Sequence, residues 1–190
     1  PVGQILMLRF NHLHPPFNNP KIRQAVMVAV KQDDYLQAVV GNPQYMRECK
    51  SYFTCGTPLA NDAGIEVMTG NLDQAKRMLA EAGYNNEPVV IISPSDYPTI
   101  HAQGLVTADL LRRLGMNVEF VATDWGTVLS RRASRNPIGQ GGWNIFITSA
   151  DGLSSSNPIW AAAHAATGER GRNGGKGGQR GQDEADRRHI

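Results

Sequence analysis

The sequence predicts an α/β fold in which a mainly parallel or mixed sheet is flanked by helices. Between Val89 and Thr148, apolar runs alternate with segments of helical periodicity in the order strand, helix, strand, helix, strand. Crossover connections of this kind pair parallel strands and place helices against the sheet. A chain of 190 residues, 41% of them hydrophobic, is also long and apolar enough for one domain with a buried core.

The first two elements follow from an apolar run and a capping pair. Ile5 to Phe10 is apolar enough for a buried strand. Asn19 then supplies an N-cap, and Pro20 takes the first helical position, where its missing N–H costs nothing. The helix that begins there has one apolar face at helical spacing, made of Ile22, Ala25, Val26, Ala29 and Val30.

Two more helices flank a long irregular segment. Asp33 or Asp34 can cap a short helix that is ended by Gly41. Residues 42–70 have no sustained periodicity and are rich in Gly, Pro, Asn and Thr, which predicts a long surface loop. An amphipathic helix is then expected over residues 73–82, with an apolar side made of Ala75, Met78, Leu79 and Ala82.

The second half predicts three strands and two helices. Residues 89–92 form the first strand, 99–114 a helix, 117–122 a second strand, 124–135 a helix, and 143–148 a third strand. Open α/β sheets place ligands at the carboxyl ends of their strands, so the loops there are the first candidates for a site.

The net charge of +2 comes from the end of the chain. Residues 1–168 contain 13 Lys and Arg against 13 Asp and Glu, whereas residues 169–190 contain six basic and four acidic residues. The first part therefore gives no electrostatic reason to expect nucleic acid or a membrane as partner. Residues 169–190 are rich in Gly and Arg with almost nothing to bury, which predicts a disordered tail. They lack the interleaved aromatics of RNA-binding segments, so an RNA-binding tail is the weakest alternative.

The sequence also bears on location. No apolar run approaches the roughly 18 residues needed to span a bilayer, and the opening Pro1-Val2-Gly3 has none of the features of a signal peptide. The protein is therefore expected either to be cytosolic or to have its export signal upstream of this sequence.

No motif for catalysis or for a cofactor emerges. There is no Gly-x-Ser-x-Gly or His-Glu-x-x-His, and the glycine-rich residues 139–142 precede a strand instead of following one, which indicates a turn. His12 and His14 alternate on an extended segment but have no third ligand nearby in sequence. We expect no metal, no cofactor and no enzymatic activity, with a small α/β enzyme or nucleotide-binding domain as the alternative.

The two cysteines leave several possibilities open. Cys49 and Cys55 could form a disulfide, half of a metal site, or two separate thiols. Five intervening residues fit a small closed loop, and no second Cys or His pair at metal-ligand spacing follows.

Two stretches, residues 11–26 and 71–84, resemble a known family. The first combines an Asn at the end of a strand, a Pro-Phe turn and a helix reading Ile22-Arg23-Gln24-Ala25; the second is the helix Asn71 to Tyr84. Together they resemble the C-terminal lobe of the family 5 periplasmic solute-binding proteins, which feed peptides, nickel complexes and related solutes to ABC importers. The resemblance covers roughly residues 5–160, and so it implies that the chain is a fragment of such a protein.

The resemblance implies a fold, a function and partners. It implies a periplasmic-binding-protein-like lobe over residues 1–168, followed by the tail. It implies capture of a peptide or related small solute between this lobe and a missing N-terminal lobe, and delivery to the membrane subunits of an ABC importer. It implies a periplasmic location with a signal peptide upstream, where a bridge between Cys49 and Cys55 would persist.

The resemblance also assigns candidate binding residues in two loops. Ser95 and Tyr97 follow the first strand of the second half, and in the peptide-binding relatives a Tyr at the place of Tyr97 faces the cleft. Packing at the start of a helix is the equally good structural reading of Tyr97.

The loop after the third strand, residues 149–158, corresponds to the family's main specificity segment. Relatives have Gly-Trp where this chain has Ser149-Ala150, and an acidic residue that pairs with a peptide's amino group where it has Ser154. Asp151 is the one carboxylate left in this loop. These departures weaken the expectation of a peptide with a free amino terminus, since a buried ammonium without its carboxylate is costly.

Overall fold

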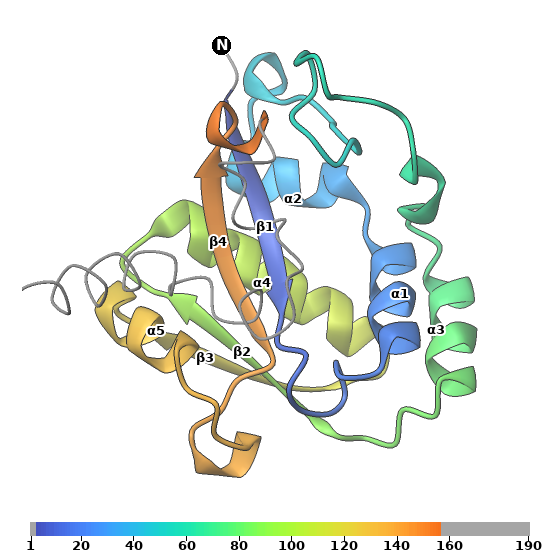
Figure 1. Ribbon diagram of the computed structural model, residues 1–190, viewed down its shortest axis with the longest axis vertical. Coiled ribbons are helices and arrows are strands. Elements are labelled where there is room, and N and C mark those ends of the chain that lie inside the picture. The colour runs from blue at the N-terminus through green and yellow to red at the C-terminus, as the bar shows by residue number, and fades with distance from the viewer. Residues whose placement is uncertain (1–2, 157–190) are drawn as a thin grey trace, which may run out of the picture.

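The computed structural model describes residues 3–156, and its centre is a mixed sheet of four strands (Figure 1). The order across the sheet is β1-β4-β2-β3, and the strands span Gln4–Phe10 (β1), Pro88–Pro94 (β2), Asn117–Thr123 (β3) and Ile145–Asp151 (β4). β2 pairs in parallel with β3 and with β4, whereas β1 is antiparallel to β4. The expected α/β class with a mixed sheet is therefore confirmed. The predicted tail, residues 169–190, lies outside the described residues.

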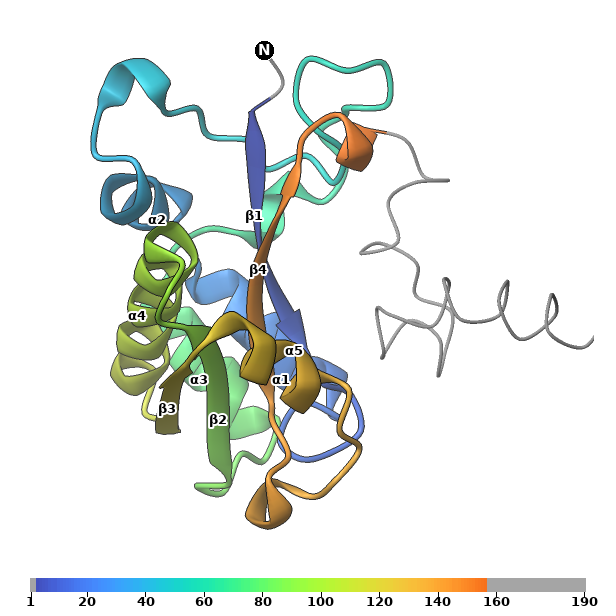
Figure 2. The same cartoon turned by 90° about the vertical axis from the view of Figure 1, so that its left-hand side faces the viewer.

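Helices cover both faces of the sheet. Figure 2 shows α4 (Pro98–Arg113) on one face and α5 (Trp125–Arg132) on the other. Next to α4 lie α2 (Gln32–Val39) and the packed pair α1 (Pro20–Ala29) and α3 (Leu72–Glu81). The larger core lies between this helical layer and the sheet, and the smaller core lies under α5. β2 is buried from Val89 to Pro94 because both layers cover it, which explains its continuous apolar sequence from Val89 to Ile92.

Asparagines and an aspartate start three of the helices. Asn19 accepts a hydrogen bond from the backbone N–H of Lys21 and begins α1 with Pro20, as predicted. Asn71 caps α3, which begins at Leu72, one residue earlier than predicted. Asp124 caps α5, which ends at Arg132 and not at Arg135.

The start of α2 corrects the expectation that Asp33 or Asp34 would cap it. The N-cap position belongs to Lys31, whose side chain makes no capping hydrogen bond, and both aspartates lie in the first turn. Their carboxylates are still favourable there because the amino-terminal end of a helix carries partial positive charge.

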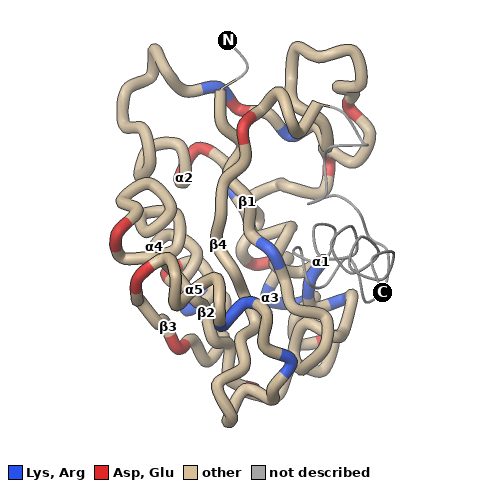
Figure 3. The backbone as a smooth tube through the Cα atoms, turned by 60° about the vertical axis from the view of Figure 1, so that its left-hand side comes forward, with Lys and Arg blue, Asp and Glu red and all other residues tan. Residues whose placement is uncertain are grey.

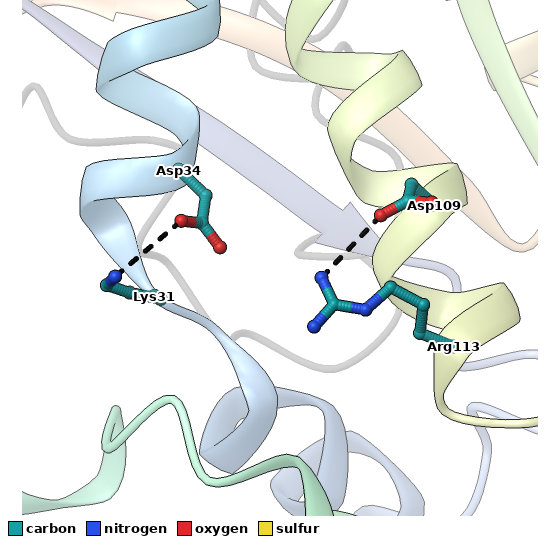
Figure 4. A network of polar contacts seen from close by, with 4 residues as sticks. All are labelled: Lys31, Asp34, Asp109 and Arg113. Carbon is teal, nitrogen blue, oxygen red and sulfur yellow. Dashed lines mark ion pairs between the residues drawn. The ribbon is translucent and has the colours of Figure 1, made fainter.

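α2 lies against α4 through a mixed contact. The hydroxyl of Thr107 donates to the hydroxyl oxygen of Tyr35 at 3.3 Å inside the contact. At its rim, the Lys31–Asp34 pair at 3.9 Å and the Asp109–Arg113 pair at 3.7 Å lie on the sides by which the two helices face each other, and both pairs are exposed to solvent (Figure 4). Exposed pairs of this kind stabilise by less than about 1 kcal/mol, so the packing of the helices holds this contact.

Two buried asparagines join the beginning of β4 to its neighbours. Asn144 accepts from the Val90 N–H at 2.8 Å through its side-chain oxygen and donates to the Pro15 carbonyl at 2.9 Å through its amide. Asn11 donates to the Trp143 carbonyl at 2.9 Å and accepts from the Leu13 N–H at 3.0 Å. The turn after β1 is thereby fixed to β4 and β2.

The irregular segment between α2 and α3 contains two single turns, Pro43–Tyr45 and Ile65–Val67, and one covalent bridge. Cys49 and Cys55 are joined by a disulfide with their Cα atoms 5.8 Å apart, as the family resemblance implied. The bridge closes a short loop within this irregular segment, residues 40–71, which we call the excursion.

The described residues carry mixed charge and no membrane-spanning helix. Basic and acidic residues are both distributed over the elements (Figure 3). Within residues 3–156, no helix is both long enough and apolar enough to cross a bilayer.

Candidate functional site

The turn after β2 is fixed by hydrogen bonds to β3 and α5. The backbone N–H and the hydroxyl of Ser95 both donate to the Thr123 carbonyl, at 2.7 and 3.1 Å. The carboxylate of Asp96 accepts from the Trp125 N–H at 3.2 Å. Ser95 thus holds the turn in place, and Tyr97 follows it at the N-cap of α4.

Tyr97 begins a line of aromatic side chains, which we call the aromatic row: Tyr97, Trp125, Phe146 and Trp143. Their ring centroids are separated by 5.4, 6.0 and 6.3 Å in that order. Tyr97 is 46% exposed, whereas Phe146 and Trp143 are buried. The ring of Tyr97 therefore packs on Trp125 at the start of α4, and almost half of its surface remains open to solvent. Sequence reasoning missed Trp125 and Phe146, which stand at ordinary helix and strand positions.

β4 is longer than the strand that the sequence predicts there. Ser149, Ala150 and Asp151 were expected in a loop, but they belong to β4, where they pair with Leu6, Ile5 and Gln4 of β1. The loop begins only at Gly152. The antiparallel partner supplies the hydrogen bonds that keep these small polar residues extended.

Asp151 and Ser154 are bonded to each other. One carboxylate oxygen of Asp151 accepts from the Ser154 N–H at 2.8 Å, and the other accepts from the Ser154 hydroxyl at 2.6 Å. These hydrogen bonds lower the pKa of Asp151, so its carboxylate is ionised at neutral pH. Asp151 therefore closes the turn that follows β4.

One edge of β4 has no strand partner in the described part of the chain. β2 pairs with β4 only at Ile145 and Phe146, so residues 147–151, which we call the free edge, continue with β1 beyond the end of β2 (Figure 1). Unpaired backbone groups on such an edge can bond another extended chain. Tyr97 and the free edge both lie at the carboxyl ends of parallel strands, where ligands were expected.

The predicted binding residues in β4 lie on two different faces of the sheet. Alternate residues share a face, so Ala150 lies on the same face of the sheet as Phe146, whereas Ser149 and Asp151 lie on the opposite face. All three contribute backbone to the free edge. The candidate site is therefore this edge together with the aromatic row.

A cavity of about 320 Å³ lies elsewhere, and none of the predicted ligand-binding residues lines it. β1, α1, α2 and the excursion enclose it, and most of its lining is apolar, including Leu6, Leu8, Phe10 and Val26. The lining has no Asp, Glu or His, and its one cysteine, Cys49, is in the disulfide.

The histidines of the first turn form no metal site in the described structure. His14 is hydrogen-bonded through Nε2 to the Arg135 carbonyl at 3.0 Å. Within residues 3–156, no three His, Cys, Asp or Glu side chains gather as metal ligands would.

The mixed sheet, its two helical layers and the open strand ends define the class: this is a lobe of the kind found in periplasmic binding proteins. CtaP, an ABC transporter substrate-binding protein from Listeria monocytogenes, has the same fold, with a TM-score of 0.76 at 15% identity over 92% of this chain and 35% of that one. DppA from Helicobacter pylori, solved in complex with the peptide STSA, gives 0.69 at 21% identity over 91% and 33% of the two chains.

Sequence comparison gives the family. The model of the bacterial extracellular solute-binding proteins, family 5 (middle region), matches residues 1–166, and the chain belongs to this family. It is 36% identical over 170 residues to a probable peptide ABC transporter periplasmic-binding protein of Sinorhizobium fredii (strain NBRC 101917 / NGR234), covering 88% of this chain and 32% of that protein. The chain thus spans about a third of the length of each of these relatives.

Proposed function

We propose that residues 1–168 are one lobe of a two-lobed binding protein that captures a peptide-like solute and delivers it to the membrane subunits of an ABC importer in the periplasm. Membership of the family and the names of the relatives support this role. The relatives are named as binding proteins, which favours binding over the small-enzyme alternative.

The proposal rests on the free edge of β4 as the place where the solute binds. An extended solute can add to an exposed strand edge, where main-chain hydrogen bonds supply affinity and neighbouring side chains supply selectivity. Tyr97 offers an exposed aromatic ring that packs on Trp125, and Trp125 in turn stacks on Phe146, the residue that directly precedes the free edge. A second lobe would close over this open side, and contacts from both lobes would stabilise the closed state.

The solute is proposed to be held by its main chain and not by a buried amino terminus. Both carboxylate oxygens of Asp151 already accept hydrogen bonds from Ser154, and Ser154 itself carries no charge. A peptide-like solute paired along residues 147–151 does not require an ammonium partner there.

The test is an NMR titration of the 190-residue chain with tri-alanine, because one wall of a two-walled site should bind only weakly. Amide shifts should concentrate at residues 147–151 and at the Trp125 indole. Tyr97→Ala should weaken binding by about 1–3 kcal/mol if the ring stacks on the solute. Tyr45→Ala is the matched control, because Tyr45 is 77% exposed and lies on the excursion. Shifts that avoid the free edge, or equal affinities for Tyr97→Ala and wild type, would refute the site.

A further inference from the structure

The excursion between α2 and α3 reaches the end of β4 through one buried hydroxyl. Thr54 is 5% exposed, and its Oγ1 donates to the carbonyl oxygen of Gly152 at 2.7 Å, across 98 positions of sequence. The N–H of Gly152 in turn donates to the Gly3 carbonyl at 2.9 Å. The residue immediately after the free edge is therefore held from both sides, at the end of the molecule where the excursion and β4 meet (Figure 2).

Thr54 is itself held by the disulfide loop. It directly precedes Cys55, whose N–H donates to Cys49 Sγ at 3.1 Å in addition to the covalent bridge. Gln32 binds Cys49 twice, donating to its carbonyl at 2.8 Å and accepting from its N–H at 2.9 Å. A continuous set of contacts thus connects the first residue of α2 to Gly152.

We propose that Thr54 is a positioning residue for the candidate site, and that the Cys49–Cys55 bridge acts on the site through it. This inference rests on the proposed function of the free edge. The Thr54 carbonyl accepts from the N–H of Thr57 at 3.2 Å and from its hydroxyl at 2.6 Å, but these contacts lie within the excursion itself, whose only regular elements are single helical turns. A covalent loop restricts the conformations that would carry the hydroxyl away from Gly152.

The first experiment measures hydrogen exchange of the Gly152 amide by NMR in the 190-residue chain, without any solute. Thr54→Val keeps the shape of the side chain and removes the donor, so the Gly152 amide should exchange about five-fold faster, as the loss of one hydrogen bond implies. Thr54→Ser keeps the donor and should exchange like wild type. Thr57→Val is the matched control, because the Thr57 hydroxyl donates within the loop to the Thr54 carbonyl at 2.6 Å and does not bond Gly152.

The second experiment asks whether the bridge acts through Thr54. Replacing both cysteines by serine should speed Gly152 exchange severalfold in the wild-type background, but by less than about two-fold when Thr54 is already valine, because coupled residues are not additive. Equal effects in both backgrounds would mean that the bridge acts by another route. Unchanged Gly152 exchange in Thr54→Val would overturn the positioning role.

Titration with tri-alanine separates this inference from the function on which it rests. Thr54→Val should bind tri-alanine about five-fold more weakly than Thr54→Ser and Thr57→Val. If wild type fails to bind tri-alanine at the free edge, the proposed function fails, and the exchange measurements still decide the role of Thr54. If wild type binds and Thr54→Val binds equally well despite faster exchange, Thr54 does not position the site.

Discussion

Asn144→Ala should be among the most destabilising single changes in the described structure. Asn144 is fully buried at the entrance to β4, and its side-chain amide bonds the Val90 N–H and the Pro15 carbonyl. Alanine can replace neither contact. The substitution therefore leaves the buried Val90 N–H without a partner and removes the bond to the Pro15 carbonyl, which is only partly buried.

The magnitude follows from these two groups. The buried Val90 N–H that loses its partner costs about 1–3 kcal/mol, and the lost bond to the partly buried Pro15 carbonyl about 0.5–1.5 kcal/mol, so together they should lower the free energy of unfolding by roughly 1.5–4.5 kcal/mol. A domain of this size has a total stability of about 5–15 kcal/mol, so the loss is a large share of it. The contacts of Asn11 with Trp143 and Leu13 remain in the variant and should keep part of the junction intact.

Urea unfolding followed by far-ultraviolet circular dichroism measures this loss. Asn85→Ala is the control, because Asn85 is exposed and should change stability by less than about 0.5 kcal/mol. If Asn144→Ala lost less than about 1 kcal/mol while Asn85→Ala behaved as expected, the buried amide would not be the element that joins β4 to the turn after β1.

Two further predictions concern the layers on either side of the sheet. Hydrogen bonds from Thr127 lower the pKa of Asp124 in the folded state, so the charged cap stabilises the fold above the unfolded pKa near 4, and this contribution disappears as pH falls through the lower folded value. The stability advantage of wild type over Asp124→Asn, measured by urea unfolding, should therefore shrink below about pH 4. An advantage that persists at pH 2 would contradict this prediction. Gly104→Ala would place a methyl carbon 2.7 Å from the Ser93 hydroxyl oxygen, so it should destabilise by about 1 kcal/mol despite the better helix propensity of alanine. Combining it with Ser93→Ala should recover part of that loss, and a stabilised single variant would contradict the crowding.

Much of the fold was predictable because its signals are local. Asn19 and Pro20 specify the start of α1 through capping chemistry alone, and the apolar run at Val89 identifies the strand that both layers bury. The end of β4 was not predictable in this way. Ser149 and Asp151 have little strand preference and become extended because β1, more than 130 positions earlier in the sequence, pairs with them.

The site was partly predictable for the same reason. The rule that ligands bind at strand ends, together with the family resemblance, made Tyr97 a candidate, but Trp125 stands in the sequence as the first residue of a helix and gives no signal that it packs on Tyr97. The contact of Thr54 with Gly152 depends on how the excursion folds back over the sheet. Such long-range contacts leave no local pattern in the sequence from which they could be predicted.

The hydrogen bond between Gly152 and Gly3 has a topological consequence. Because β1 and β4 are antiparallel neighbours, the polypeptide enters and leaves residues 4–151 at the same point. The unit has the geometry of an insertion, whose two ends could be joined to a host chain without stretching either partner. It could be exchanged as a cassette by recombination at these two positions, and a lobe grafted there would pivot on two adjacent strands.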